Sequence, residues 1–349
     1  MSDEIRYAAV DYDPFADPPI IEFPATEAQR ELWGAVLLGA DASRAYNESV
    51  TLELEGPVEL DALLEAIRDL PRMHEALRAS FSDEGSTVRI APHIELDLGV
   101  TERPLEEILE TDAQREYDLE NGPLFRASVV RKNAERHWVV LAAHHIVCDG
   151  WSFGVLLSDL AARYNARKAG DGDPSPQGSF QRYAEEERQW TLTSGHREAQ
   201  HYWLERLGDV PAAVDLPTDT PRPALKSFRS KRADARVSEA TVQALKKAAA
   251  KSGASLFAAL LAGFNALVYR LSGQETVVVG VPTAGQTHSQ ERNLVGHCVN
   301  VMPVRTEMDG TRSAADAIRS ARTAMLDGSE HQRLTFGSLL QSLPIERDP

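Results

Sequence analysis

The sequence predicts an α/β protein built from two lobes of similar size. Three observations support this class. The chain has 349 residues, about twice the roughly 150 of a common domain. Strand-like alternation and helix-like spacing of apolar residues recur in both halves, and residues 169–178 (AGDGDPSPQG) are dense in Gly, Asp, Pro and Ser. We therefore expect a leader at 1–23, a first lobe at 24–170, a linker at 171–178 and a second lobe at 179–349.

The composition excludes several classes of protein. A net charge of −16 and 42% hydrophobic residues argue against a nucleic-acid binder and against a disordered chain. No apolar run reaches the roughly 20 residues of a membrane span, and the acidic N-terminus lacks the pattern of a secretion signal. We expect a cytoplasmic protein with no membrane partner, in which Cys148 and Cys298 are free thiols.

In the first lobe the elements follow from apolar spacing. Val50, Leu52 and Leu54 alternate with polar residues, which indicates a half-buried strand. Helical spacing over 60–81, interrupted near Pro71, indicates a broken helix. The remaining elements expected here are strands at 87–91, 94–100 and 124–130, a polar helix at 104–117, a strand at 138–143 that is apolar without alternation and hence central, and an amphipathic helix at 153–164.

The second lobe opens with charged helical segments and a crossing punctuated by prolines. Ser252 and Gly253 mark the end of one helix and the start of another. The elements expected here, in order, are helices at 180–190 and 196–207, a crossing at 215–224, a strand at 232–237, helices at 239–251 and 256–269, strands at 276–281 and 299–306, and a helix at 314–326.

The strongest local feature is the run HHIVCDG at 144–150, between the expected central strand and the helix after it. Adjacent residues of an extended segment point to opposite sides, so only one of His144 and His145 can face a cavity. A histidine can deprotonate an attacking amine or alcohol, or hold it by a hydrogen bond. Asp149 suits a structural role paired with an arginine, and Gly150 allows a ligand to approach the backbone closely.

Two other interpretations of this run compete with a catalytic one. A histidine that ends a buried strand is often an ordinary core residue, and His and Asp are also zinc ligands. However, adjacent side chains diverge, and neither cysteine has a partner at metal spacing, so we expect no metal. The sequence also contains no G-x-S-x-G, GxxxxGK[ST] or GxGxxG pattern, which leaves a serine hydrolase and a nucleotide site without support.

The run matches the HHxxxDG motif of condensation domains of nonribosomal peptide synthetases, in the chloramphenicol-acetyltransferase-like superfamily. Further segments resemble this family in its own order along nearly the whole chain. They are 24–33 (PATEAQRELW), 74–81 (HEALRASF), 183–190 (YAEEERQW), 280–285 (GVPTAG), 295–305 (VGHCVNVMPVR), and His331-Gln332 with Phe336.

The resemblance implies two acetyltransferase-like lobes in a V-shaped pseudo-dimer with a tunnel between them. Donor and acceptor would enter as thioesters on the phosphopantetheine arms of carrier proteins, with no cofactor bound by the chain itself and an adenylation domain nearby. The residues carried over are His145 as the residue that positions or deprotonates the acceptor amine, His144 and Asp149 as the residues that shape the loop, and Gly150, Trp151, Ser152 and Asn300 at the substrate.

The chain departs from the family pattern at two places. Met73 stands where the family has an arginine, a natural partner for Asp149, which leaves Arg78 as the candidate. The family's last motif stops at 346–349, so we expect a truncated second lobe. The alternatives are a CoA-dependent or ester-forming acyltransferase of the same superfamily and a non-catalytic module that recruits carrier proteins. We also expect a locally basic rim for acidic carriers at Arg229, Lys231 and Arg232.

Overall fold

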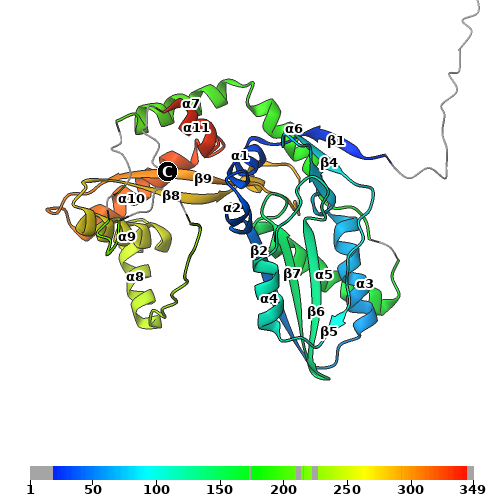
Figure 1. The fold of residues 1–349 in the computed structure, drawn as a ribbon. Helices are drawn as coiled ribbons and strands as arrows, with labels where there is room; N and C mark the ends of the chain where they lie inside the picture. Colours follow the sequence, from blue (N-terminus) through cyan, green and yellow to red (C-terminus); the bar gives the residue numbers. More distant parts are fainter. Residues whose placement is uncertain are drawn as a thin grey trace, which may run out of the picture.

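The first lobe is built around a four-stranded sheet with the order β2-β7-β6-β5 (Figure 1). Its strands are β2 (Asn47–Glu55), β5 (Val100–Thr101), β6 (Phe125–Asn133) and β7 (Arg136–His144). β7 pairs antiparallel with both β2 and β6, and β5 pairs with β6 in parallel. The computed structural model describes residues 19–172, 174–209, 214, 216–221, 227–291 and 293–343.

Helices cover both faces of this sheet. Helices α3 (Leu60–Met73) and α5 (Gly150–Ala169) pack on one face, where Leu141 of β7 joins the main core. Helix α4 (Leu105–Ala113) covers the other face, where Ile108 meets Val140. The uninterrupted apolar run of β7 is explained by this burial on both sides.

A smaller sheet with the order β1-β4-β3 closes one end of the first lobe. It consists of β1 (Ile21–Pro24), β3 (Ala79–Phe81) and β4 (Thr87–Ile90). Helices α1 (Glu27–Val36) and α2 (Ala40–Arg44) follow β1, and the short helix η1 (Glu75–Arg78) precedes β3. The Thr26 side chain accepts a hydrogen bond from the Gln29 amide, and the Gln29 side chain accepts one from the Thr26 amide, so α1 begins with a capping box.

The second lobe contains an antiparallel ribbon of β8 (Thr276–Ala284) and β9 (Val299–Glu307). Helices α7 (Ser194–Leu207), α9 (Leu256–Ser272), α10 (Ala314–Ser329) and α11 (Phe336–Ser342) pack with this ribbon around Trp203, Met302 and Val304. Helix α8 (Glu239–Lys251) projects from the lobe beside α9 (Figure 1).

One face of α9 is exposed and apolar. The side chains of Phe257, Leu260, Phe264, Leu267 and Leu271 follow one another at intervals of three and four residues and are each about half exposed. Within the described residues no single helix has the length and apolar character to cross a membrane. Helices α8 and α9 meet those criteria only as a pair, which is bent by 99°.

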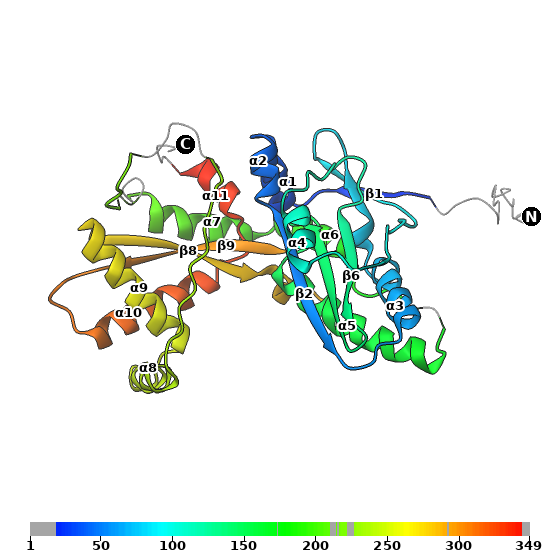
Figure 2. The same cartoon turned by 60° about the horizontal axis from the view of Figure 1, so that its bottom comes forward.

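The lobes meet where β2 begins and β7 ends, against one end of the β8–β9 ribbon (Figure 2). Helix α6 (Phe180–Trp190) runs between them. The main core of the first lobe includes Phe180 and Tyr183 of α6, and also Leu294 and Cys298. On a second line of contact, the Ser338 hydroxyl of α11 donates to Glu27 of α1 at 2.8 Å. The junction therefore shares one apolar core with the first lobe.

Several sequence expectations about elements are wrong in detail. Helix α3 continues through Pro71 and ends at Met73, and residues 79–81 form β3. Residues 94–99 are not a strand. Strand β1 takes in residues 21–23 of the expected leader together with Pro24, because β4 supplies a partner 63 or more residues away. Residues 232–237 form no strand, since every side chain from 231 to 238 is exposed and none of these residues pairs with a described strand. The crossing at 215–224 lies largely outside the described residues.

Candidate functional site

The HHIVCDG run forms the loop that joins the buried strand β7 to helix α5. His144 is the last residue of β7, and Asp149 is the N-cap of α5, with its side chain accepting from the Ser152 amide at 2.8 Å. The Gln29 side chain of α1 donates to the Ile146 carbonyl at 3.1 Å and fixes the middle of the loop. A rigid strand on one side and a capped helix on the other therefore hold the loop in place.

His144 points into the first lobe. It is fully buried, and its ring lies against the rings of Tyr46 and Tyr117 at centroid distances of 6.2 and 5.9 Å. Its Nδ1 accepts a hydrogen bond from the Ile146 amide. Burial and the neighbouring His145 lower the pKa of His144 to about 4, so the ring is neutral near pH 7 and stabilises the loop as a packed residue.

His145 points the other way, toward the junction of the lobes, and its side chain is 19% exposed. Its Nδ1 lies 2.8 Å from the Cys148 carbonyl oxygen. Because a carbonyl oxygen only accepts, Nδ1 carries the proton, and Nε2 is the free nitrogen of the neutral ring. The ring of His297 meets the ring of His145 edge-on, with the two ring centroids 4.8 Å apart. Nε2 of His145 lies 3.6 Å from Oε1 of Glu48.

Asp149 connects the lobes without an arginine. One carboxylate oxygen accepts from the Ser152 amide at 2.8 Å and from its hydroxyl at 2.7 Å. The other accepts from the Gln286 side chain at 2.8 Å and from the Cys298 amide at 3.1 Å. The candidate Arg78 is wrong, because its guanidinium donates to the carbonyls of residues 71, 91 and 92. Four donors, two from each lobe, thus satisfy the carboxylate.

Ser152 adds a second link across the junction. Its hydroxyl donates to Asp149 and lies 3.0 Å from both the carbonyl oxygen and the amide nitrogen of Gly296. A Cβ on Gly296 would lie 2.2 Å from the ring of Phe180. Only glycine therefore lets the 294–298 segment approach closely enough to reach Ser152. The structure places Ser152 in the scaffold of the site, where it is fully buried.

Two hollows flank these contacts. Gly150 and Trp151 line one of about 520 Å³, and Trp151 is 52% exposed. Asn300 lines another of about 220 Å³ between the first turn of α1, α6 and residues 332–335. Its amide group donates to the carbonyls of Gln332 and Leu334, each at 2.7 Å, and its side-chain oxygen accepts from two backbone amides. Asn300 thus ties β9 to α11 while lining a cavity.

The thiols of Cys148 and Cys298 are both free and buried, and burial raises the pKa of each. Within the described ranges no group of three or more His, Cys, Asp and Glu side chains could hold a metal ion. The loop and its surroundings present an imidazole nitrogen, a carboxylate 3.6 Å from it and the first amides of a 20-residue helix.

The model of the condensation-domain family matches residues 21–349. The chain belongs to this family, and the resemblance found in its motifs is confirmed. Tyrocidine synthase 3 of Brevibacillus parabrevis is 32% identical over 343 residues, which are 95% of this chain and 5% of that protein. Malpibaldin synthetase of Mortierella alpina is 33% identical over 332 residues, 90% of this chain and 6% of that protein. The chain spans a small part of these relatives.

Solved structures share the fold. The first condensation domain of the calcium-dependent antibiotic synthetase, in complex with a substrate analogue, has a TM-score of 0.78 at 23% identity. The match covers 92% of this chain and 78% of that domain's chain. The X-domain from teicoplanin biosynthesis has a TM-score of 0.81 at 24% identity, and the match covers 92% of this chain and 74% of the X-domain chain. The expected α/β class is confirmed by this likeness.

Sequence reasoning missed three residues that the structure brings to the loop, namely Glu48, Gln286 and His297. Gln286 follows a recognised motif and His297 lies within one, but nothing local says that they reach Asp149 and His145. Glu48 did leave a signal. It continues the inward positions of Val50, Leu52 and Leu54 on β2, so the alternation puts a carboxylate where an apolar residue is expected.

The bonds of Asp149 predict the effect of an isosteric change. In Asp149→Asn an NH₂ group replaces one of the two acceptor oxygens. Depending on which oxygen is replaced, the NH₂ group faces the donors of Ser152 or the pair of donors from Gln286 and Cys298. We expect a loss of about 1–3 kcal/mol in the free energy of unfolding, measured by urea denaturation. Asp97→Asn, at an exposed position, is the control; equal stabilities of the two variants would contradict the role of Asp149.

The buried histidines predict a loss of stability in acid. Burial, with His145 and His144 nearby, lowers the pKa of His297 to about 3, while an unfolded histidine titrates near 6.5. The unfolded chain therefore binds more protons below about pH 6.5, and the free energy of unfolding falls as pH drops from 6.5 toward 3. We expect the free energy of unfolding of His297→Gln to fall less steeply between pH 7.5 and 5 than that of the wild type. A parallel course would contradict this, and His93→Gln, at an exposed position, is the control.

Proposed function

We propose that this chain joins a donor acyl group to an acceptor amine, as a condensation domain of a nonribosomal peptide synthetase. The observation that carries the proposal is the orientation of His145. Its ring meets His297 of the second lobe at the junction, and its Nε2 carries no hydrogen bond with any described residue, while its Nδ1 is fixed by the Cys148 carbonyl. A fixed imidazole with a free nitrogen is suited to hold an amine for attack.

The proposed reaction uses the groups around the loop in distinct roles. His145 binds the acceptor amine and orients its lone pair toward the carbonyl carbon of the donor thioester. Gly150 begins α5, and the first amides of this 20-residue helix favour the negative charge that develops on the carbonyl oxygen. His144 and Asp149 hold the loop, and Trp151 borders the approach to it.

The partners proposed are a donor and an acceptor carrier protein, each presenting a phosphopantetheine arm, and an adenylation domain in the same assembly. A four-domain nonribosomal peptide synthetase in its holo form, solved with AMP and glycine, supports this setting, with a TM-score of 0.82 and 96% of this chain covered. The phosphopantetheine belongs to the carriers and enters the site as part of the substrate.

A second candidate is a non-catalytic recruiting module. The likeness to the X-domain fold favours it, since one structural neighbour is a complex of the X-domain and OxyB, with a TM-score of 0.82 at 23% identity. Met73, in place of the family's arginine, does not add support, because Asp149 is satisfied by Ser152, Gln286 and Cys298. The complete His145 site favours catalysis over recruitment alone.

Removing the imidazole of His145 tests the catalytic role. With both loaded carriers supplied, we expect His145→Ala to lower the rate of amide formation by about 100-fold or more, the scale of a lost acid–base group. Product is measured by mass spectrometry, and His93→Ala, at an exposed position, is the control. Equal yields from His145→Ala and wild type would contradict catalysis, and carrier binding without product in the wild type would favour recruitment.

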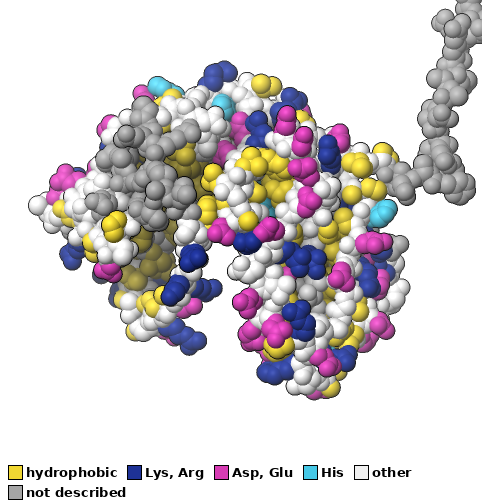
Figure 3. Space-filling model, viewed as in Figure 1, with side chains coloured by type: hydrophobic (Ala, Val, Ile, Leu, Met, Phe, Trp, Pro, Cys, Tyr) yellow, Lys and Arg dark blue, Asp and Glu magenta, His cyan; other side chains and the backbone are white. Residues whose placement is uncertain are grey.

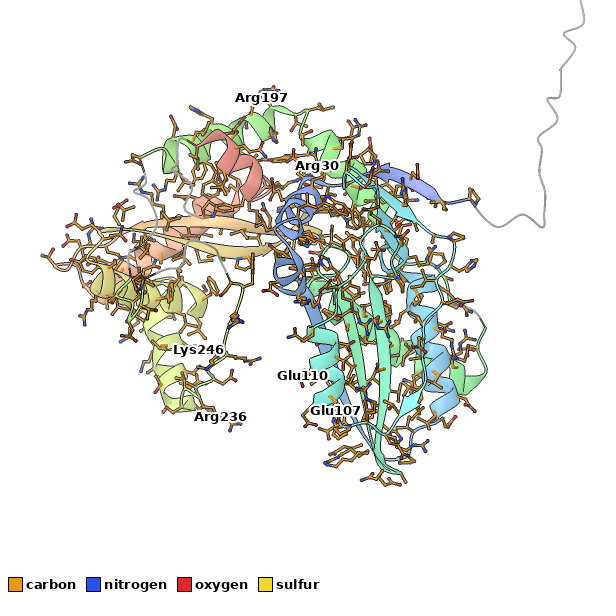
Figure 4. The ribbon with its side chains drawn as sticks, in the orientation of Figure 1. Arg30, Glu107, Glu110, Arg197, Arg236 and Lys246 are labelled. Atoms are coloured by element: carbon orange, nitrogen blue, oxygen red, sulfur yellow. The ribbon has the colours of Figure 1, made fainter. Side chains whose placement is uncertain are left out.

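The basic rim predicts a salt-dependent contact with carriers. Arg229, Lys231 and Arg232 are exposed just before α8, and Figure 3 shows Lys and Arg side chains gathered on this edge of the second lobe. Figure 4 places Arg236 and Lys246 on the same edge, across from Glu107 and Glu110 of α4. We expect reversal of the three charges to weaken binding of an acidic carrier about tenfold at low salt, measured by calorimetry, and less at high salt.

The control for charge reversal keeps the same change in net charge. It reverses three exposed arginines on α7, α9 and α10, namely Arg197, Arg270 and Arg322. If both triple variants bind the carrier equally, the rim before α8 is not the contact.

A further inference from the structure

A carboxylate lies beside His145 at a position where the fold does not require one. Glu48 is the second residue of β2 and pairs in register with Ala143 of β7. It shares its face of the strand with Val50, Leu52 and Leu54, which pack against the main core. Its side chain is 34% exposed, and its Oε1 lies 3.6 Å from Nε2 of His145. Burial of this kind disfavours a charge, so the position needs a reason other than packing.

The tautomer of His145 makes this pair unusual. Because Nδ1 donates to the Cys148 carbonyl, Nε2 of the neutral ring is an acceptor. The carboxylate of Glu48 is also an acceptor, so two lone pairs face one space, 3.6 Å apart. A nitrogen with two N–H groups can lie about 2.8–3.0 Å from both atoms at once, since two such bonds together exceed 3.6 Å. An α-ammonium group has this geometry.

While the nearby imidazole rings are neutral, they give the carboxylate of Glu48 no positive charge. Burial raises the pKa of Glu48 above its usual range; His145 lowers it, and Asp149 raises it. His297 and His144, the other titratable rings here, have pKa values lowered to about 3 and 4 and are neutral near pH 7. Among the described residues, the ion pair given for Glu48 is with His145, and it is an ion pair only when that ring is protonated. A cation supplied by the substrate would therefore complete the site.

We propose that Glu48 and His145 together bind the α-ammonium group of the acceptor and accept the proton that it must lose before it attacks. This rests on the proposed condensation function and names the acceptor chemistry of the same site. It assigns Glu48 as a further catalytic residue.

Protons and bonds balance over the reaction. The ammonium group gives one proton to the Glu48–His145 pair and becomes a neutral amine. Its lone pair forms the C–N bond at the thioester carbonyl carbon, and the C–S bond breaks. The amine's second proton leaves with the sulfur as a thiol, and the pair releases the first proton to water. Ammonium and thioester thus yield amide, thiol and one proton.

The first experiment compares wild type and Glu48→Gln over pH 6.5–9 with aminoacyl-pantetheine acceptors and a loaded donor carrier. An α-amine titrates near 7.7–8.0, so it enters as ammonium at pH 6.5 and as neutral amine at pH 9. We expect kcat/KM of Glu48→Gln to be at least about tenfold lower at pH 6.5, with a gap that closes toward pH 9. A gap that is the same at every pH, or no gap, overturns the proposal.

The matched control is Glu53→Gln, which removes an exposed carboxylate from the same strand, where it pairs with Arg136 at 3.1 Å. It should follow the wild type at every pH. If the wild type itself forms no amide at any pH, the proposed function fails rather than the role of Glu48.

The second experiment needs no donor and no turnover. Calorimetry measures binding of aminoacyl-pantetheine and of its N-acetyl form to the wild type and to Glu48→Gln at pH 6.5. We expect the wild type to prefer the free amine and Glu48→Gln to lose that preference while binding the N-acetyl form unchanged. Equal affinity of the wild type for both probes overturns the proposal, even where the enzyme is active.

Discussion

The carboxylate of Asp149 is the contact on which the geometry of the site depends. It caps α5, which sets the direction of the helix after the loop, and it accepts from Gln286 and Cys298 of the second lobe. These donors lie 137 and 149 residues away in sequence, so a single buried group joins the strand, the helix and both lobes. A buried charge is tolerated only when its hydrogen bonds are complete, and here four donors complete them. The loop that carries His145 is therefore fixed relative to both walls of the junction.

The two adjacent histidines have different roles in the loop: His144 packs in the core, and His145 presents a nitrogen to a ligand. His144 lies among aromatic rings and is neutral because ionisation in that environment is costly. His145 has one nitrogen occupied by the Cys148 carbonyl and the other free. A single histidine could not both close the core at the end of β7 and present a nitrogen to a ligand. The extended backbone solves this by pointing consecutive side chains to opposite sides.

What the sequence predicts well is whatever depends on neighbours along the chain. The run at 138–143 and the spacing of Leu156 and Leu160 locate β7 and α5, because burial on two faces and on one face leave different patterns. Strand β1 escaped prediction, since its pairing partner lies more than 60 residues away. The partner of Asp149 escaped for the same reason: neither the Cys298 amide nor Gln286 has any local mark of its role. The expectation of an arginine came from the usual pairing of carboxylates, whereas backbone and amide donors satisfy the same need.

Negative charge near His145 differs in its effect from negative charge on the surface. The chain carries −16 overall, but exposed charges are screened within about 8 Å at physiological salt and cannot position one amine. Glu48 is partly buried beside neutral rings, where the effective dielectric is lower and a cation at hydrogen-bond distance is held far more strongly. An amide-forming site must bind an ammonium ion and release a neutral nucleophile. A carboxylate whose own protonation is eased by burial is suited to both steps, because it attracts the cation and then accepts its proton.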